Sequence, residues 1–401
     1  MANKLSIAIM SDLHFIAADN EQKTSYVDLS RVRAEKQDPI ADLYRFAEEN
    51  ALCADILMCP GDITVAACAS GLTAAWAALQ HTASVLGADH IFAATGNHDI
   101  SSRTGETEPE IWERLKLLTP SYPSPGLNEM DRLRYWAEHF FVVRVGSVRI
   151  LVLNTCNTHA RGQKEYAHGR VTDYTIQRIL EMTPSDPDVS LNVLLCHHHP
   201  FRYPDLDQSA PDYSEMAQGI KLIEELSRSE QPWLIIHGHK HFPRLTYAGG
   251  TSSSPTVFSA GSFSAILSPV YFQTAVNQFY ILDLDIDDLS RLGGVGTVRS
   301  WEWIKSIGWS PSDFASNHPG KIVNGCGFGH RENIHALAGR IASLVQPGTA
   351  VSWTDIESRH PDMKYMLIED RAKLMSMLME RHGIRAVGQN PLNPVQLLRE
   401  A

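Results

Sequence analysis

The amino-acid sequence predicts an α/β fold built around a parallel sheet, and three observations support this. Short apolar runs alternate with amphipathic stretches through the first two-thirds of the 401 residues. A strand, a helix and a second strand in succession form a right-handed βαβ unit, in which the two strands are parallel. Acidic residues and histidines directly follow the apolar runs, where the strands of such a sheet would end.

The elements of the first third follow from apolar periodicity and helix-start signals. Asp38 before Pro39 is typical of a helix N-terminus, because aspartate caps the first amides and proline suits the first turn. Strands are predicted at 5–11, 54–60 and 90–95, and helices at 38–50 and 66–88.

The middle of the chain continues the alternation after a polar, proline-containing stretch. This stretch, 101–130, predicts an inserted loop with a short helix near 109–118. Gly146 separates two predicted strands within 140–155, and Thr172 or Asp173 caps the next helix. The further predictions are strands at 191–196 and 232–236, helices at 171–182 and 214–229, and mainly β-structure over 244–304.

The character changes after about residue 306, where helical patterns dominate and Gly383 marks a helix end. We therefore predict a domain over 1–305 and a C-terminal helical extension over 306–401. Residues 331–401 hold nine basic and eight acidic residues, so this region is nearly neutral. The sequence of this region is consistent with several roles. It could be a helix-turn-helix-like interaction module, a contact for an oligomer or protein partner, a lid, or a set of helices that merely covers the sheet.

Composition indicates a globular protein of a reducing compartment. Apolar residues make up 43% and charged residues 20%, and no apolar run approaches the ~20 residues that span a bilayer. The N-terminal apolar stretch ends too soon, at Asp12, for a secretory signal, and we expect a cytoplasmic protein without membrane contact. The six cysteines are scattered without a CxxC pair: Cys53, Cys59, Cys68, Cys156, Cys196 and Cys326. The net charge of −11 does not favour broad binding to nucleic acid.

Potential metal ligands gather at five predicted strand ends. In open α/β sheets, ligands bind beyond the carboxyl ends of the strands. An Asp-x-His or Gly-Asp pair is common by itself, but one metal site explains the whole set. The residues are Asp12, His14, Asp62, Asn97, His98, Asp99, His197, His198, His199, His237, His239 and His241.

The order of these blocks resembles the calcineurin-like metallophosphoesterase family over roughly residues 4–300. The matching blocks are DLH (12–14), GD (61–62), GNHD (96–99), HHP (198–200) and GHKH (238–241). The resemblance implies a four-layer αββα sandwich, in which helices flank two mixed β-sheets. The forms GDIT, HHHP and GHKH look most like the class III cyclic-nucleotide phosphodiesterases. GNHD in place of GNHE, without Arg-Gly after Gly-Asp, argues against the phosphoprotein phosphatases.

The resemblance also implies two divalent metal ions, which could be Mn, Fe, Zn or Ni. In the family pattern the ligand of the fourth block stands two residues before the proline. This selects His198, and the run of three histidines leaves His197 as the alternative. His237 is then an extra residue that ends its strand or supports the site. The implied ligands are Asp12, His14, Asp62 and His241 for one ion, and Asp62, Asn97, His198 and His239 for the other.

The implied reaction is attack on phosphorus by a hydroxide that bridges the two metals. His98, next to the ligand Asn97, would protonate the leaving oxygen. Asp99 would orient His98, or alternatively would form a turn or helix-cap hydrogen bond. Loop residues that could contact phosphate or base are Arg103, His159, Arg161, His168, Arg170, Arg202 and Tyr203.

These implications predict a phosphodiesterase that acts on a nucleotide-like substrate. The alternative is a metal-dependent DNA nuclease that works with a partner protein, although the net charge does not favour nucleic acid. A phosphomonoesterase is less favoured. A non-catalytic scaffold is also less favoured, because relatives of that kind lose ligands and every ligand position is filled here.

Overall fold

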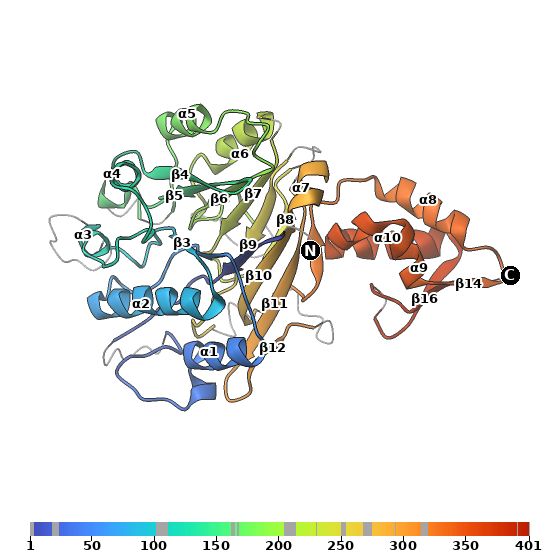
Figure 1. The fold of residues 1–401 in the computed structure, drawn as a ribbon, viewed down its shortest axis with the longest axis horizontal. Helices are drawn as coiled ribbons and strands as arrows, with labels where there is room; N and C mark the ends of the chain where they lie inside the picture. The colour runs from blue at the N-terminus through green and yellow to red at the C-terminus, as the bar shows by residue number, and fades with distance from the viewer. Residues whose placement is uncertain are drawn as a thin grey trace.

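The computed structural model describes residues 4–17, 24–101, 111–161, 165–166, 168–203, 214–229, 231–249, 254–267, 275–292, 294–313, 320–390 and 392–400. Within these residues the chain forms two mixed β-sheets with flanking helices and a smaller C-terminal unit (Figure 1). The predicted fold class, a sandwich of two mixed sheets between helices with an additional C-terminal region, is confirmed.

The first sheet has a parallel half and an antiparallel half. Strand β1 pairs in parallel with β2 and antiparallel with β10, so β1 joins the two halves. The order is β12 (Gly308–Pro311), β11 (Gly296–Ile304), β10 (Asn277–Asp285), β1 (Lys4–Ile9), β2 (Ile56–Cys59) and β3 (His90–Ala93), with β13 (Cys326–Phe328) also paired to β11.

The second sheet is parallel at its centre and antiparallel at both edges. Strands β5, β6, β7 and β9 run parallel, whereas β4 and β8 pair antiparallel with their neighbours. The order is β4 (Phe140–Val145), β5 (Val148–Leu153), β6 (Leu191–Leu195), β7 (Trp233–His237), β9 (Thr256–Ser259) and β8 (Arg244–Tyr247).

Alternating side chains of the second sheet separate two apolar layers. Along β5, Ile150 and Val152 belong to the core shared with the first sheet, whereas Leu151 and Leu153 pack with α5 (Asp173–Met182) and α6 (Gly219–Arg228). This alternation arises because successive side chains of a strand point to opposite faces. The helices α1 (Pro39–Glu49) and α2 (Ala69–Leu86) lie on the other side of the molecule (Figure 1). The remaining helices of this domain are α3 (Glu113–Lys116), α4 (Glu129–Ala137) and α7 (Ile286–Leu292), with 3-10 turns at Glu35–Gln37 and His159–Arg161.

Capping residues fix the helix ends where the sequence predicts them. Asp38 accepts hydrogen bonds from the backbone amides of Ile40 and Ala41, at 2.9 and 3.3 Å, and Pro39 is the first residue of α1. Thr172 caps α5 by accepting from Thr175 N at 3.1 Å. Gly383 ends the helix α10 (Ile368–His382) with φ of 64°, a left-handed conformation that glycine adopts at little cost.

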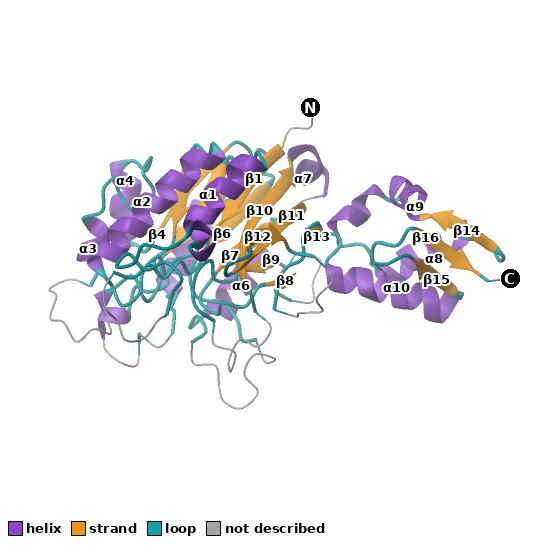
Figure 2. Cartoon of the chain, turned by 90° about the horizontal axis from the view of Figure 1, so that it is seen from below, coloured by secondary structure: helices purple, strands orange, loops and turns teal. Residues whose placement is uncertain are grey.

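The C-terminal unit has a hydrophobic core and a small sheet of its own. Leu337, Ile356, Leu374 and Leu397 pack into a cluster separate from the core of the sandwich. Figures 1 and 2 show this unit projecting from one side of the sandwich. It comprises α8 (Ile334–Leu344), β14 (Thr349–Ser352), α9 (Trp353–Arg359), a 3-10 turn (Pro361–Tyr365), α10 (Ile368–His382), β15 (Ile384–Val387) and β16 (Gln396–Arg399).

Two features of this region differ from the sequence-based expectation. The antiparallel sheet β14-β16-β15 lies in the region that the sequence predicts as a helical extension. The first sheet also extends beyond residue 305, because β12 and β13 both pair with β11. No helix among the residues described here is long and apolar enough to cross a membrane.

Candidate metal centre

The carboxyl ends of five parallel strands meet at one edge of the two sheets. Segments after β1, β2 and β3 approach from the first sheet, and segments after β6 and β7 approach from the second. Backbone hydrogen bonds join the segments: Asp12 N donates to Gly61 O at 3.0 Å, and Gly238 N donates to His197 O at 3.1 Å. The predicted gathering of polar residues at this edge therefore occurs.

One group of donor atoms consists of Asp12, His14 and His241. The Nε2 atoms of His14 and His241 lie 3.1 Å apart, although 227 positions separate them in the chain. His241 Nε2 is 3.3 Å from Asp12 Oδ1, and His14 Nε2 is 4.0 Å from the same oxygen. The three side chains present their ligand atoms to one small volume.

A second group surrounds the side chain of His197. Its Nε2 atom lies 3.1 Å from Asn97 Oδ1 and 3.1 Å from His239 Nδ1. The same atom is 3.3 Å from Asp62 Oδ2, which in turn lies 3.9 Å from His14 Nε2 of the first group. One oxygen of Asp62 is therefore close to both groups.

Two further histidines lie beside these groups, and a ligand atom of His198 is within 4.8 Å of those of His197 and His239. His198 Nδ1 lies 2.7 Å from Thr155 Oγ1, and its ring contacts that of His239 at a centroid distance of 4.5 Å. His237, the last residue of β7, lies 2.8 Å from Tyr203 Oη through Nε2. The structure thus brings His197, which the sequence offered only as the alternative, to the position beside Asp62 and Asn97.

Several residues of the two ligand groups have an unusual backbone conformation. A positive φ is uncommon outside glycine, and such residues cluster at functional sites. Five residues of the two groups have φ between 51° and 76°: Asp12, His14, Asp62, His239 and His241.

Two glycines allow the segments to approach each other. A Cβ on Gly96 would lie 2.2 Å from Asp62 N and Oδ1, and a Cβ on Gly238 would lie 2.2 Å from Ser11 Oγ. Any larger residue would therefore displace Asp62 or the segment that carries Asp12. The glycines of GNHD and GHKH are required by this packing.

Burial sets the ionisation of the histidines in these groups. It lowers the pKa of His14 to about 3, with a contribution from His241, and it holds the pKa of His239 well below its ordinary value. The pKa of His198 is held down in the same way by burial and by His197. These imidazoles are therefore neutral at neutral pH, which is the form that binds metal.

Asp62 and its neighbour His197 are the side chains of the second group that are charged. Burial would raise the pKa of Asp62, but His197 and His98 hold it well below its ordinary value. Burial would lower the pKa of His197, but Asp62 raises it to about 9. The negative charge of buried Asp62 is thus balanced by a proton on His197. A bound cation would supply this positive charge in place of the proton.

The donor set fits a pair of divalent cations. Ligand atoms about 2.1 Å from one ion lie roughly 3.0–3.4 Å from each other, and the contacts within each group fall mostly in this range. Neutral imidazoles, ionised carboxylates and an amide oxygen are ligands of Mn, Fe, Zn and Ni. The residues present are therefore suitable for two ions that share Asp62.

His98 and Asp99 have separate surroundings. His98 N donates to Asp62 Oδ1 at 2.8 Å, and its partly exposed ring lies 5.2 Å from the His14 ring between centroids. The Asp99 carboxylate accepts from the backbone amides of Asp62, Thr64 and Gly96, at 3.0, 3.1 and 2.8 Å. Burial and Asp62 raise the pKa of Asp99 to about 7. Asp99 thus joins the second and third strand ends.

The loop residues predicted to contact substrate have varied environments. His159 is buried beside His198, at a ring distance of 5.7 Å. Arg170 forms a two-point ion pair with Glu165, at 2.9 and 3.1 Å. His168 Nδ1 lies 3.1 Å from Gly169 O, and Tyr203 contacts His237 as described above. Arg103 and the side chain of Arg161 lie outside the described residues, and Arg202 is exposed.

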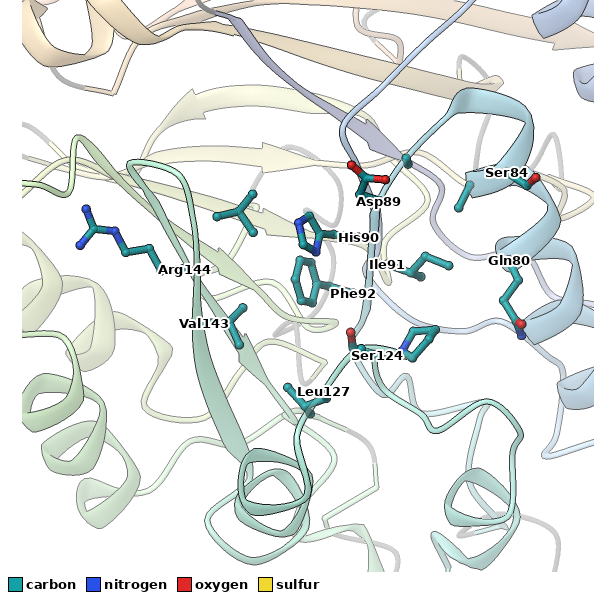
Figure 3. Close-up of a pocket in the computed structure, with 15 residues that line it drawn as sticks. Gln80, Ser84, Asp89, His90, Ile91, Phe92, Ser124, Leu127, Val143 and Arg144 are labelled. Atoms are coloured by element: carbon teal, nitrogen blue, oxygen red, sulfur yellow. The ribbon is translucent and has the colours of Figure 1, made fainter.

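A cavity of about 440 Å³ lies at the opposite end of the strands. Figure 3 shows His90 and Phe92 of β3, Val143 and Arg144 of β4 and Gln80 of α2 around it. Because His90 begins β3 whereas Asn97 follows the end of that strand, this cavity is separate from the candidate metal centre.

Two family models match parts of this chain. A model of the calcineurin-like phosphoesterase family matches residues 5–268. The chain belongs to this family. A second model, named wHTH-Calcineurin_assc, matches residues 326–380, which include α8, α9 and most of α10.

Solved structures with similar folds share little sequence with this chain. A purple acid phosphatase from yellow lupin seeds is 12% identical, with 75% of this chain and 52% of that chain covered and a TM-score of 0.45. A putative 5'-nucleotidase from Staphylococcus aureus is 15% identical, with coverage of 70% and 51% and a TM-score of 0.40. A metallophosphoesterase from Sphaerobacter thermophilus is 13% identical, with coverage of 72% and 86% and a TM-score of 0.28. The chain spans about half the length of the first two, and no curated protein gives a significant match.

Proposed function

We propose that this protein hydrolyses a phosphodiester bond in a nucleotide-like small molecule with two divalent metal ions. The observation that carries the proposal is the position of Asp62 Oδ2, within 3.9 Å of His14 Nε2 and 3.3 Å of His197 Nε2. One ion would be held by Asp12, His14, Asp62 and His241. The other would be held by Asp62, Asn97, His197 and His239.

His197 replaces His198 in this proposal because of its contacts. The Nε2 atom of His197 lies within 3.3 Å of three other proposed ligand atoms. The Nδ1 atom of His198 is instead hydrogen-bonded to Thr155, at 2.7 Å. Asn97, His239 and the remaining predicted ligands keep the roles that the family resemblance implies.

The bound pair would neutralise the negative charge of the phosphate ester and lower the pKa of water at the site. The protein contributes fixed positions for these charges. Asp12 is held by backbone His239 N, at 3.1 Å from Oδ1, and Asp62 is held by backbone His98 N. Each carboxylate thus accepts a hydrogen bond from the backbone of a segment that carries another proposed ligand. These bonds fix the two groups of ligands relative to each other.

His98 is the proposed proton donor to the leaving oxygen. It stands next to Asn97, its ring packs against His14, and part of it is accessible to solvent. A diester releases an alcohol that needs a proton, so a donor at this point would assist the reaction. Asp99 is proposed to position Asp62 by accepting a hydrogen bond from the Asp62 backbone amide. It is not proposed to orient His98, because its carboxylate oxygens already accept from three backbone amides.

A metal-dependent DNA nuclease is the second candidate. The match of residues 326–380 to a family named for a winged helix-turn-helix favours it. Surfaces that bind DNA are rich in Lys and Arg, however, because they must neutralise phosphates. The exposed charged residues of α10 have both signs: Glu369, Lys373, Glu380 and Arg381. We therefore rank the small-molecule diesterase first.

A substrate panel with the manganese-loaded protein tests the proposal. It would comprise cyclic nucleotides, linear dinucleotides, single-stranded and double-stranded DNA, phosphomonoesters and bis(p-nitrophenyl) phosphate. We expect turnover of nucleotide diesters, loss of turnover in chelator and recovery when metal is restored. Exclusive cleavage of DNA would favour the second candidate, and exclusive cleavage of monoesters would overturn the diesterase assignment. The Asp62→Asn variant controls for a contaminating hydrolase.

A further inference from the structure

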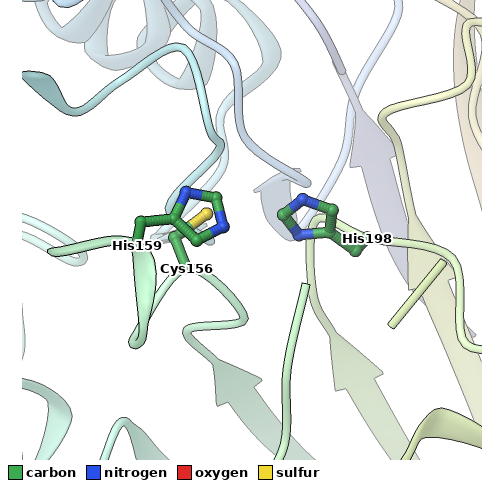
Figure 4. A group of neighbouring side chains, drawn as sticks. All are labelled: Cys156, His159 and His198. Carbon is green, nitrogen blue, oxygen red and sulfur yellow. The ribbon is translucent and has the colours of Figure 1, made fainter. Parts of the chain in front are cut away.

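A second set of metal-ligand side chains lies next to the proposed pair. Cys156 follows β5, His159 lies in the 3-10 turn after it, and His198 follows β6 (Figure 4). Their ligand atoms lie within 4.8 Å of one another, and each side chain is almost completely inaccessible to solvent. We infer that Cys156, His159 and His198 bind a zinc ion that is distinct from the two ions of the proposed pair.

The environment of His198 favours a ligand role outside the pair. Its Nδ1 atom is hydrogen-bonded to Thr155 Oγ1, and its buried Nε2 atom has no hydrogen-bond partner among the described residues. A buried polar nitrogen without a partner costs free energy, which a metal ion would remove. With His197 beside Asp62 and Asn97, His198 is available to a neighbouring cation.

His159 is held in a form that suits coordination. Its Nε2 atom lies 3.0 Å from the carbonyl oxygen of His168, and a carbonyl only accepts, so Nε2 carries the proton. The lone pair of the neutral ring is therefore on Nδ1. Metal-binding histidines usually donate their second ring N–H to a carbonyl or carboxylate in this way.

The chain around His198 leaves it little room to move. A Cβ on Gly169 would lie 2.5 Å from His198 Cγ, so the backbone after His168 packs directly on the ring. The segment that orients His159 therefore also holds His198 in place. Cys156 Sγ lies 3.4 Å from Thr95 O, a weak thiol contact that a thiolate bound to metal would give up.

The ligand types indicate zinc. A thiolate with two imidazoles is typical of Zn²⁺, whereas the proposed pair, whose ligands include two carboxylates and an amide oxygen, also suits Mn²⁺. Three protein ligands leave one tetrahedral position for a water molecule or a substrate oxygen. A cavity of about 500 Å³ includes Asn157 and Thr158 in its lining, and these residues lie between Cys156 and His159 in the chain. The cavity therefore borders the segment that carries two of the three proposed ligands.

Metal counting on the full-length protein tests the inference. The protein would be loaded with manganese and then with zinc, freed of loosely bound ions, and measured by elemental analysis. We expect Cys156→Ser and His159→Gln each to bind about one zinc fewer than the wild type, with manganese unchanged. The exposed Cys53→Ser and the buried Cys326→Ala serve as controls and should retain all zinc. Equal zinc in Cys156→Ser and the wild type would overturn the inference.

Two spectroscopic measurements remain decisive if the variants do not fold. Cobalt added to the wild type should give a thiolate-to-cobalt charge-transfer band, because Cys156 would be the sulfur ligand. X-ray absorption of the zinc-loaded wild type should show sulfur at about 2.3 Å from zinc. Only nitrogen and oxygen around zinc, with no charge-transfer band for cobalt, would exclude the site. Neither result depends on which ester the protein hydrolyses.

Discussion

His197 Nε2 lies 3.3 Å from Asp62 Oδ2, whereas the adjacent His198 turns toward Thr155. Two consecutive residues therefore have different roles: His197 belongs to the proposed pair, and His198 lies outside it. Variants that differ only in which histidine is removed will test this arrangement.

His197→Ala should lose manganese from the proposed pair and lower kcat/KM by at least about 100-fold. Removing a residue that only supports a metal ligand already lowers activity by roughly 10–100-fold, and removing the ligand itself should cost more. His198→Ala should keep the manganese. His237→Ala should also keep it, but should lose the contacts of the buried ring with Tyr203 and the Gly238 carbonyl, at a cost of about 1–3 kcal/mol in unfolding free energy. Elemental analysis with urea unfolding measures both properties. Manganese depleted in His198→Ala but retained in His197→Ala would reverse our assignment.

His98→Ala should retain both metals and lower kcat by about 100-fold, as expected for removal of a proton donor. The loss should grow as the leaving group becomes a weaker acid, because such groups depend most on protonation. Aryl diesters with leaving groups of different pKa provide the measurement, and metal content is the control. A variant that had lost metal would show that His98 binds it.

Asp99→Ala should destabilise the fold by about 3 kcal/mol, since three backbone amides would lose a buried acceptor. Urea unfolding measures this loss. An unchanged unfolding midpoint combined with a large fall in kcat would instead support the role predicted from the sequence, in which Asp99 orients His98.

Asp288 connects the sandwich to the C-terminal unit, and its contact should depend on pH. Tyr365 and Arg291 lower the pKa of Asp288 through hydrogen bonds, so its ionised form stabilises the native state. This stabilisation is complete at neutral pH and is lost as the pH falls below the ordinary value of 3.8. Asp288→Asn should cost about 1 kcal/mol at neutral pH and progressively less in acid. Thermal unfolding of the variant and the wild type at several pH values measures this; an equal difference at every pH would contradict it.

Much of the fold and site was predictable because short, strongly patterned segments determine it. Asp12, Asp62 and Asn97 follow apolar strands whose last residues are buried, and Asp38 caps a helix through contacts local to the chain. Such signals depend on nearby residues, and the sequence displays them directly.

The remainder depends on packing between distant segments. The choice between His197 and His198 depends on how the chain turns after β6, where His197 O accepts from Gly238 N. The strands β14, β15 and β16 have four residues each and lie among stronger helical patterns. Two of the three amides bonded to Asp99 belong to the distant segment after β2, at Asp62 and Thr64, so the sequence around Asp99 gave no indication of them.

Asp62→Asn should abolish binding of both ions in the proposed pair and reduce turnover by at least about 100-fold, because the shared residue would lose its charge. The exposed Asp89→Asn carries the same change away from the site and should behave as the wild type. Metal content and diester hydrolysis, measured on the same preparations, provide the comparison. Full metal content in Asp62→Asn would remove Asp62 from its bridging role.

Anomalous diffraction from crystals of the manganese-replete wild type tests the central claim most directly. We predict two manganese peaks on either side of Asp62, one beside Asp12, His14 and His241 and the other beside Asn97, His197 and His239. A map without peaks at this position, from protein shown to be metal-replete, would contradict the account.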